Sequence, residues 1–362
     1  MKNLLCNAVI AAIWVGIAAT QQTFFPNELQ SGDVHVDFAS TSPDGPRLNP
    51  GPNATTYDWW YFDAVSTSSN ESISIVFLMA SSTAFPSSDT GGTMSVIVSG
   101  SFANGSAFSH TIPASDGALI IESEDKDEIN GAWGGANASF GGRGLDSNET
   151  SFKVILNSPE YGVYGSLSLR SALPSRYPCG LNAPGAEQQV LPGVGWSNPQ
   201  PDASAIANFQ LGNATLNFSG SGYHDKNWGS VPFTQAVGSW HWGHARIGPY
   251  SMVWIDARSP TGDTHRSGFV SKNGTVLLSS CASDSVGVTT WGDGLANSTS
   301  GLLVEFGLTG GGHLTMNITT TVMIVNSPVY LRYLGVASGR VGDEFQFDGV
   351  ASLDAFNFSV SS

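Results

Sequence analysis

Short apolar or alternating runs recur along the whole chain and predict β-strands. Gly, Asn, Ser, Asp or Pro bounds each run, as expected where strands end in turns. The runs cover residues 72–79, 93–102, 151–157, 164–170, 214–220, 250–257, 268–271, 300–308, 313–325 and 329–335. Apolar spacing of helical period is hard to find after residue 19. The pattern therefore predicts an all-β protein, built from sandwiches or barrels.

One long segment, residues 173–203, interrupts this rhythm. It is rich in glycine and contains Pro174, Pro178, Pro184, Pro192, Pro199 and Pro201. A long segment without periodicity inside a domain is typically a lid, a covering loop or a linker. A turn at 231–233 then separates two series of strands. We predict one domain over 21–232 and a second over 233–362, with ligand-binding residues near the seam.

The first 20 residues have the pattern of a secretory signal peptide. An apolar run over 4–19 is followed by Thr20, near which we expect cleavage. No later run reaches the length of a membrane span, so we predict no membrane partner. Eleven Asn-x-Ser/Thr sites support a glycosylated protein of the secretory pathway. They are Asn53, Asn70, Asn104, Asn137, Asn148, Asn213, Asn217, Asn273, Asn297, Asn317 and Asn357.

Charge and cysteine content narrow the choice of partners. The formal net charge is −15, from 14 basic and 29 acidic residues, which argues against nucleic acid and anionic membrane surfaces. Cys6 would leave with the signal peptide, so Cys179 and Cys281 remain. In an oxidising compartment these two favour one disulfide, with two buried thiols as the alternative. Two cysteines so far apart make neither a zinc site nor a redox motif.

Aromatic residues gather in four segments together with acids, His and Asn. The most informative is 223–229, Tyr-His-Asp-Lys-Asn-Trp-Gly, and the others are 58–63, 240–244 and 254–256. Apolar walls with a few fixed polar groups suit a pocket for a hydrophobic small molecule. A plain sandwich core is the competing interpretation, with the charges at its rim.

Strand periodicity assigns the side chains of these segments to faces. Segment 239–247 places four of them on one face: Trp240, Trp242, His244 and Arg246. After a hairpin turn at Gly248-Pro249, a second set has the same alternation: Met252, Trp254, Asp256 and Arg258. We expect these two faces to form one aromatic wall with an acid and two basic groups in it.

The segments 223–229 and 58–63 divide in the same way. Alternation separates the first into two sets: Tyr223, Asp225 and Asn227, and His224, Lys226 and Trp228. Asp is a poor strand residue, so the presence of Asp225 in a strand needs a reason. We assign it a structural role, in which it accepts backbone N–H bonds at the domain junction. The alternative is that it orients substrate or transfers a proton. Asn227 and Trp228 are assigned to the pocket. In 58–63 one face is core and the other cavity, and we place Trp60 and Phe62 at the cavity.

Several common catalytic signatures are missing from the sequence. There is no Gly-x-Gly-x-x-Gly fingerprint, no P-loop and no Gly-x-Ser-x-Gly elbow. His241 and His244 fall on opposite faces of a regular strand and could not both bind one metal ion. We therefore predict neither a metal nor an organic cofactor.

The aromatic segments resemble the lipocalin-like family that includes carotenoid 1,2-hydratases, of the hydroxyneurosporene-synthase type, and fungal Diels–Alderases. The resemblance rests on Asp-Trp-Trp-Tyr at 58–61, on 223–229, on the Trp240-x-Trp242 pair and on a closing strand over 349–358. It implies a β-sandwich-like first domain, a lipocalin-like barrel as the second, and a ligand cavity between them. The hydratases usually have His where this chain has Lys226, and an acid near the position of Asp256, so the resemblance favours a pericyclase over a hydratase.

Signal and sequons favour the hetero-Diels–Alderases of tropolone–sesquiterpene biosynthesis within this family. The expected reaction is a [4+2] cycloaddition of a tropolone quinone methide, formed by dehydration, with a sesquiterpene such as humulene, held in one orientation by the cavity. The residues expected to bind substrate are Trp60, Phe62, Tyr223, Lys226, Trp228, Trp240, Trp242 and Trp254. His244, Arg246 or Asn227 would hydrogen-bond a carbonyl oxygen, and Asp256 or His244 would act as acid or base in the dehydration.

Four alternatives remain open at this point. The protein could be a decalin-forming intramolecular Diels–Alderase, a polyene hydratase or isomerase, or a non-catalytic carrier of a hydrophobic metabolite. A carbohydrate-binding sandwich ranks last, because it would favour a flat aromatic platform. The sequence makes no prediction about oligomeric state.

Overall fold

Nearly all of the described chain forms antiparallel β-strands joined by turns. The computed structural model describes residues 20–86, 92–292, 299–344 and 346–358. Within these ranges the helical elements with defined bounds are η2 (Pro159–Tyr161) and α2 (Phe233–Ala236). No helix in the described ranges has the length and apolarity needed to cross a membrane. The predicted all-β class is confirmed.

The first sheet carries the strands of the N-terminal two thirds of the chain. Its order is β1-β8-β9-β10-β11-β12-β16-β17-β4-β5-β6-β7. The bounds are β1 (Thr20–Phe25), β4 (Tyr57–Ser66), β5 (Ser72–Ala80), β6 (Met94–Ser101), β7 (Ala107–Pro113), β8 (Ala118–Ser123), β9 (Glu128–Trp133), β10 (Ala138–Arg143), β11 (Thr150–Ser158), β12 (Val163–Ser171), β16 (Val194–Leu211) and β17 (Ala214–Gly229). A separate short pair is formed by β2 (His35–Val36) and β3 (Leu48–Asn49).

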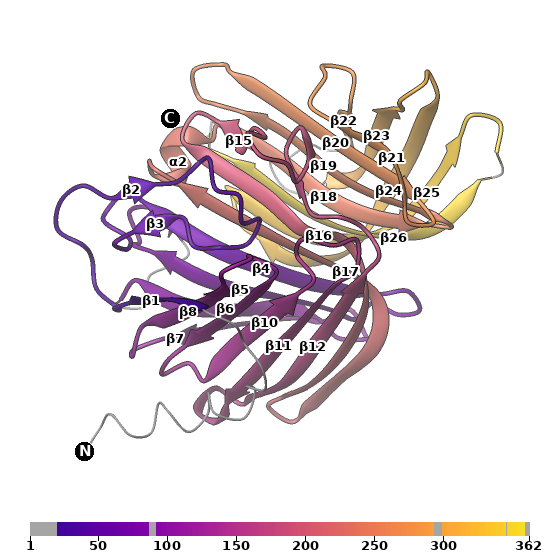
Figure 1. Ribbon diagram of the computed structural model, residues 1–362. Helices are drawn as coiled ribbons and strands as arrows, with labels where there is room; N and C mark the ends of the chain where they lie inside the picture. Colours follow the sequence, from indigo (N-terminus) through magenta and orange to yellow (C-terminus); the bar gives the residue numbers. More distant parts are fainter. Residues whose placement is uncertain (1–19, 87–91, 293–298, 345, 359–362) are drawn as a thin grey trace.

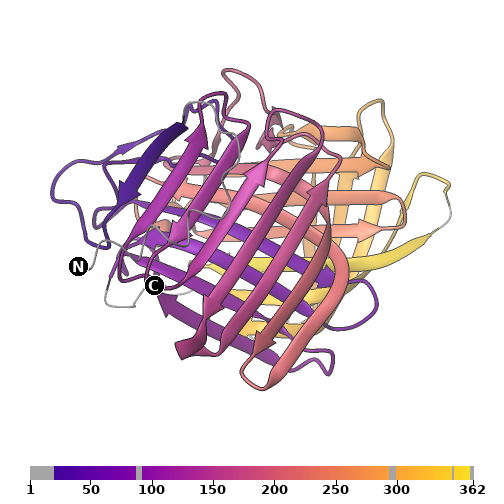
Figure 2. The same cartoon turned by 60° about the horizontal axis from the view of Figure 1, so that its bottom comes forward.

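This first sheet folds over on itself, so that its two halves face each other across a core. Figure 2 shows the magenta strands crossing in front of the indigo ones. The core between the halves draws apolar residues from both, including Phe62 and Phe77 from one half and Phe140 and Phe152 from the other. The expected sandwich-like first unit is thus formed by one continuous curled sheet.

The second sheet is a curled half-barrel with its own core. Its order is β21-β20-β19-β18-β26-β25-β24-β23-β22. The bounds are β18 (Ser239–Ile247), β19 (Tyr250–Arg258), β20 (Thr264–Lys272), β21 (Thr275–Ser280), β22 (Gly287–Gly292), β23 (Thr299–Gly307), β24 (His313–Asn326), β25 (Tyr330–Val341) and β26 (Phe347–Asn357). Figure 1 shows this sheet, orange to yellow, packed on the first. The expected barrel-like architecture is therefore present, and the chain passes between the sheets from Gly229 to Ser239.

A third apolar cluster lies between the two sheets. In β4, Trp59 and Tyr61 point into this cluster, whereas Trp60 and Phe62 point into the core of the first sheet. The split follows from strand geometry, in which successive side chains alternate between faces. Because the sheets pack on each other, both faces of β4 are buried, and the strand lacks the polar face that would reveal its orientation.

The proline-rich segment is shorter as a loop than the sequence predicts. It contains β13 (Arg176–Tyr177), β14 (Gly180–Leu181) and β15 (Gln189–Leu191), and from Val194 it is already part of β16. Pro199 and Pro201 fit inside this strand because its pairing with β17 shifts register between Ser197 and Gln200 and again before Ala203. Proline lacks the N–H of a regular ladder and is tolerated at such bulges.

The predicted disulfide between Cys179 and Cys281 is present. It ties the segment around β13 and β14 to the end of β21, and β15 also contacts β19 and β20. The insert therefore fastens the first unit to the second sheet.

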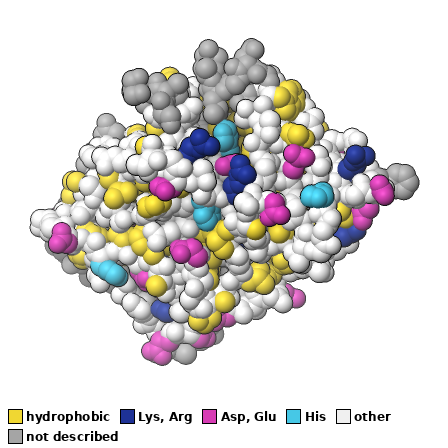
Figure 3. Space-filling model, turned by 90° about the horizontal axis from the view of Figure 1, so that it is seen from above, with side chains coloured by type: hydrophobic (Ala, Val, Ile, Leu, Met, Phe, Trp, Pro, Cys, Tyr) yellow, Lys and Arg dark blue, Asp and Glu magenta, His cyan; other side chains and the backbone are white. Residues whose placement is uncertain are grey.

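The predictions of a signal peptide and of glycosylation remain predictions, and part of them concerns residues outside the described ranges. Residues 1–19 of the expected signal peptide and the sequon at Asn297 lie outside them. Among the other sequons, Asn53 and Asn357 are partly buried and eight are exposed. On the face shown in Figure 3, basic side chains lie beside acidic and His side chains and do not form a continuous patch.

Candidate functional site

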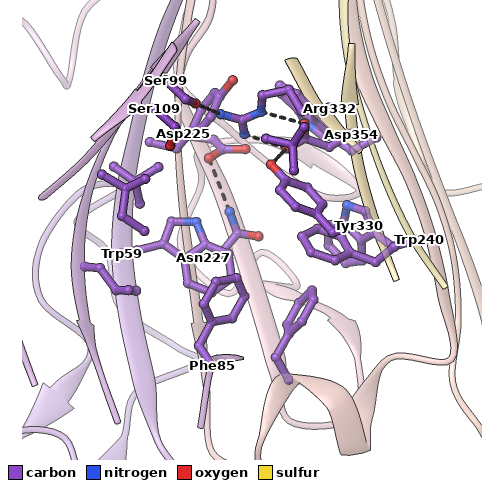
Figure 4. A pocket seen from close by; sticks show the side chains of 18 of the residues that line it. Trp59, Phe85, Ser99, Ser109, Asp225, Asn227, Trp240, Tyr330, Arg332 and Asp354 are labelled. Carbon is purple, nitrogen blue, oxygen red and sulfur yellow. Dashed lines mark hydrogen bonds and ion pairs between the residues drawn. The ribbon is translucent and has the colours of Figure 1, made fainter. Parts of the chain in front are cut away.

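The interface between the two sheets contains a cavity of about 280 Å³. The first sheet contributes side chains of β4 to β7 and β17, and the second contributes side chains of β18 and β24 to β26. Its volume is close to the lower end of the range for sites that bury a small molecule. In Figure 4 polar groups gather at one end of the cavity, around Arg332, and aromatic rings at the other, around Phe85.

Aromatic rings form a continuous surface at the apolar end. The ring centroid of Trp59 lies 4.8 Å from Phe85 and 5.8 Å from Phe233, which in turn lies 5.9 Å from Trp240. The ring of Phe233 also lies 5.1 Å from that of Phe356. Such a wall binds flat or unsaturated ligands and presents π-faces to any positive charge that develops on them.

Asp225 is a buried acid of the cavity wall. Its Oδ2 accepts hydrogen bonds from Trp196 Nε1 at 2.8 Å and Tyr223 OH at 2.9 Å, and its Oδ1 accepts one from Asn227 Nδ2 at 3.2 Å. Burial raises the pKa of Asp225 to about 7, although the Trp196 and Tyr223 donors act in the opposite direction. A carboxyl group with this pKa can both donate and accept a proton near neutral pH. The sequence-based structural role is therefore incomplete, and the donors are side chains rather than backbone N–H groups.

A second acid, Asp63, lies behind Tyr61 and connects the two sheets. Its Oδ2 accepts a hydrogen bond from Tyr61 OH at 2.8 Å and lies 2.9 Å from His244 Nε2. The His244 ring stacks on Tyr223, with centroids 4.9 Å apart. Burial raises the pKa of both phenols well above the ordinary value, so Tyr61 and Tyr223 stay protonated. His244 thus supports the cavity wall from behind.

The polar end contains an ion pair that the sequence analysis missed. Arg332 donates to both carboxylate oxygens of Asp354, Nε to Oδ1 at 2.8 Å and Nη2 to Oδ2 at 2.6 Å, and Nη1 donates to Ser74. Burial by itself would lower the pKa of Arg332, but the Asp354 carboxylate and nearby phenols raise it well above its usual value, so the guanidinium stays charged. A signal was available: Arg332 interrupts an apolar run, and a buried charge needs a partner.

Half of the segment 223–229 lies on the wrong side of β17 to reach the cavity. Lys226 forms a buried ion pair with Asp58 and its Nζ lies 3.3 Å from the centroid of the Trp60 ring. Burial lowers the pKa of Lys226 to about 8, while Asp58 opposes this. Trp228 packs under the guanidinium of Arg47, whose Cζ lies 4.5 Å from the centroid of the Trp228 ring. The predictions that Lys226, Trp228, Trp60 and Phe62 line the cavity are wrong, because strand alternation turns all four away from it.

Register corrects the expected wall of β18 and β19. Trp240 and Trp242 line the cavity as predicted. Trp254, however, pairs with Gly243, so its side chain lies on the other face and packs in the core of the second sheet. A Cβ on Gly243 would lie 2.3 Å from Trp254 Cζ2, so this glycine makes room for the indole.

Two further predicted catalytic residues lie away from the cavity. Asp256 is partly exposed and pairs with Arg266, at 3.2 Å. Arg246 donates to Asp202 of β16, with Nη2 2.7 Å from Oδ1, and so joins the two sheets. Neither lines the cavity. Of the predicted catalytic residues, Asn227 faces it directly and His244 stands one layer behind.

A metal site is suggested by one group of potential ligands in the described ranges. The sulfur atoms of Cys179 and Cys281 and a ring nitrogen of His265 lie within 4.8 Å of one another. Both sulfur atoms belong to the disulfide, so they are not available as thiolate ligands.

Comparison with known proteins identifies the family. The profile of the Diels-Alderase-like family matches residues 24–289. This chain therefore belongs to the Diels-Alderase-like family of secondary-metabolite enzymes.

Two relatives match over nearly their whole lengths. The quinolone epoxide rearrangement protein asqO of Emericella nidulans is 37% identical over 344 residues, 92% of this chain and 93% of that protein. The quinolone epoxide rearrangement protein penF of Penicillium thymicola is 35% identical over 349 residues, 94% of this chain and 96% of that protein. The Diels-Alderase poxQ of Penicillium oxalicum is 24% identical over 247 residues, 66% of this chain and 54% of that protein.

Solved structures support the fold. CghA, crystallised with Sch210972, superposes with a TM-score of 0.75 at 15% identity and covers 93% of this chain and 98% of its own. Kievitone hydratase from Nectria haematococca superposes with a TM-score of 0.51 at 12% identity, over 94% of this chain and 99% of its own. At these identities the likeness concerns the fold alone.

Proposed function

We propose that this protein isomerises an epoxide carried by a quinolone-type metabolite, using Asp225 as the general acid. The observation that carries the proposal is a protonatable carboxyl group in the wall of a cavity whose other end is a surface of aromatic rings. Two relatives of nearly full coverage are named for quinolone epoxide rearrangement, which supports the substrate class. An epoxide rearrangement requires an acid, a shaped apolar surface and no nucleophile, and the cavity offers the first two.

The proposed reaction is balanced within the substrate and one carboxyl group. Asp225 transfers its proton to the epoxide oxygen as one carbon–oxygen bond breaks, leaving a carbocation beside a new hydroxyl group. A substituent of the hydroxyl-bearing carbon then migrates with its bonding electrons to the cationic carbon, so that its bond to the hydroxyl-bearing carbon breaks as the new one forms. The hydroxyl-bearing carbon then becomes a protonated carbonyl, and its proton returns to the Asp225 carboxylate. The product is an isomer of unchanged mass.

The aromatic surface has a role in this sequence of steps. The faces of Trp59 and Trp240 stabilise a passing carbocation through cation–π interaction, which in a dry site contributes about 2 kcal/mol per ring. Trp196, Tyr223 and Asn227 hold the carboxyl group in place. They also stabilise the carboxylate that remains after proton transfer, since all three donate to it.

The test uses purified protein and a quinolone that carries an alkenyl epoxide. We expect a carbonyl isomer of unchanged mass by chromatography with mass detection, formed faster than without protein. Asp225→Asn should lower kcat by about 100-fold or more, as is typical for loss of a general acid. Asp256→Asn, a surface carboxylate paired with Arg266, is the matched control and should retain full turnover. Full activity of Asp225→Asn would exclude the proposed acid.

A [4+2] cycloaddition is the second candidate, supported by the family and by the relative poxQ. Its specific form here would join a tropolone quinone methide to a sesquiterpene such as humulene. Holding diene and dienophile on the aromatic surface would supply most of the rate enhancement. This candidate predicts a cyclised product of one enantiomer, and a cycloaddition step that tolerates Asp225→Asn. Binding of both kinds of substrate without turnover would leave a carrier.

We further propose that the protein matures in the secretory pathway. The eight exposed sequons and the Cys179–Cys281 disulfide support this location. Protein purified from culture medium should lose mass on treatment with an N-glycosidase, and its N-terminus should begin near residue 21. An unglycosylated protein confined to cell extracts would overturn this proposal.

A further inference from the structure

A buried acceptor in the cavity wall has no partner in the described part of the chain. The Oδ1 atom of Asn227 is buried, and none of the described donors reaches it. The residue itself is 5% exposed and lines the cavity. Leaving a buried polar atom unpaired costs about 1–3 kcal/mol, so the site favours a ligand that supplies a donor.

The orientation of this amide is fixed by its neighbour. Asn227 Nδ2 donates to Asp225 Oδ1 at 3.2 Å. When Asp225 is ionised, as it is after proton transfer, the opposite orientation would bring the amide oxygen against a carboxylate oxygen, and two acceptors repel. The carbonyl oxygen therefore points away from Asp225, and in Figure 4 it lies on the side of Tyr330 and Trp240.

The surroundings of Asn227 suit a flat heterocycle. Trp59, Trp240 and Trp242 all line the same cavity. Such walls accept a planar ring and leave its edge to be recognised by hydrogen bonds. Asn227 presents one acceptor to that edge.

The strand sets the distance between recognition and chemistry. Asp225 and Asn227 are two residues apart on β17 and face the same way. Their backbones are spaced by about 7 Å, and their side chains converge, with Asn227 Nδ2 3.2 Å from Asp225 Oδ1. We infer that Asn227 accepts a hydrogen bond from a ring N–H of the substrate, so that the cavity selects lactam-type heterocycles whose N–H lies within about 7 Å of the oxygen that Asp225 protonates. This inference rests on the proposed function for the position of the reacting oxygen.

The experiment compares three simple probes by calorimetric titration: 2-quinolone, N-methyl-2-quinolone and coumarin. Coumarin replaces the N–H by a ring oxygen at nearly the same size, so it separates hydrogen bonding from fit. We expect 2-quinolone to bind wild-type protein about tenfold or more tightly than coumarin, since a lost hydrogen bond to a buried acceptor is worth about that factor. The N-methyl compound should bind at least as weakly as coumarin. Equal affinity for 2-quinolone and coumarin would overturn the inference.

Variants assign the preference to Asn227. In Asn227→Leu, which keeps the volume and removes the acceptor, the preference for 2-quinolone over coumarin should fall to about twofold or less. Ser109→Ala, at another position in the cavity wall, should keep the wild-type preference. A preference that survives in folded Asn227→Leu would overturn the assignment. If circular dichroism shows this variant to be unfolded, the wild-type comparison with coumarin decides alone.

These binding measurements are independent of turnover. An N–H preference in a protein that does not rearrange quinolone epoxides would remove the proposed function and leave the recognition by Asn227. Rearrangement of epoxides without any N–H preference would remove the recognition and leave the acid role of Asp225.

Discussion

Asp225 gives the sharpest prediction, because its carboxyl group ties stability to pH. Its pKa is raised by burial from 3.8 to about 7 in the folded protein. Between these values the folded state binds more protons than the unfolded state, so stability falls as pH rises. The stabilisation is complete below about pH 4 and is lost as the pH passes through about 7.

The size of the effect follows from these two values. Taking the folded pKa as about 7 and the unfolded one as 3.8, the loss between about pH 5 and about pH 8 is about 3 kcal/mol. Asp225→Asn removes the titrating group, so the variant lacks this loss. The variant also gives up one acceptor oxygen, which lowers its stability by about 1 kcal/mol at every pH and does not change the slope.

The assay is urea unfolding of wild type and Asp225→Asn at intervals from about pH 5 to about pH 8. The difference in unfolding free energy should shift by about 3 kcal/mol across this range, in favour of the variant at high pH. Asp256→Asn, at a partly exposed ion pair with Arg266, should follow the wild-type curve. Parallel curves for wild type and Asp225→Asn would refute the raised pKa and with it the protonated acid at neutral pH.

Three further predictions concern the framework of the site. Gly243→Ala should lower the unfolding free energy by about 1–3 kcal/mol in urea titrations, because the new methyl group meets a core indole; unchanged stability would contradict the strand register. Arg332→Leu should lower it by about 3–5 kcal/mol, because Asp354 then stays buried without its partner. The double replacement of Arg332 and Asp354 by Leu should recover part of that loss, and no recovery would argue against the ion pair. Replacing both cysteines of the Cys179–Cys281 disulfide by Ser should lower the unfolding free energy by about 4 kcal/mol, because the bond joins residues 102 positions apart in the sequence. The melting temperature in calorimetry should therefore fall. An unchanged melting temperature would show that the bond does not form.

Periodicity predicted how side chains divide between faces, and the structure agrees with it in each segment. Trp240 and Trp242 share the face of β18 that lines the cavity, and Tyr223 and Asp225 share one face of β17. The orientation of β4 could not be predicted, because both of its faces are buried. An amphipathic strand shows its orientation by polar residues on one side, and this strand has no exposed side.

The pairing of strands was the second feature that the sequence could not predict. The sequence alternation of β19 matches that of β18 and suggests that Trp254 lies on the same face as Trp242. In the sheet, however, Trp254 pairs with Gly243 and so lies on the other face. The Arg332–Asp354 pair depends on β25 and β26 being neighbours in the sheet. Such adjacency is a tertiary property, whereas periodicity is a property of one strand.

The separation of the cavity-lining cluster from the core of each sheet has a consequence for how such enzymes diversify. Each sheet has a core of its own, and the cavity wall belongs to neither, because it is formed where the sheets meet. Replacement of Val76 or Ile97 by a larger residue changes the shape of the cavity, because both line it and pack against the cluster between the sheets. The cores of the two sheets keep their packing. New substrate shapes can thus arise by small changes at the seam, which gives this architecture room for reactions as different as a cycloaddition and the rearrangement of an epoxide.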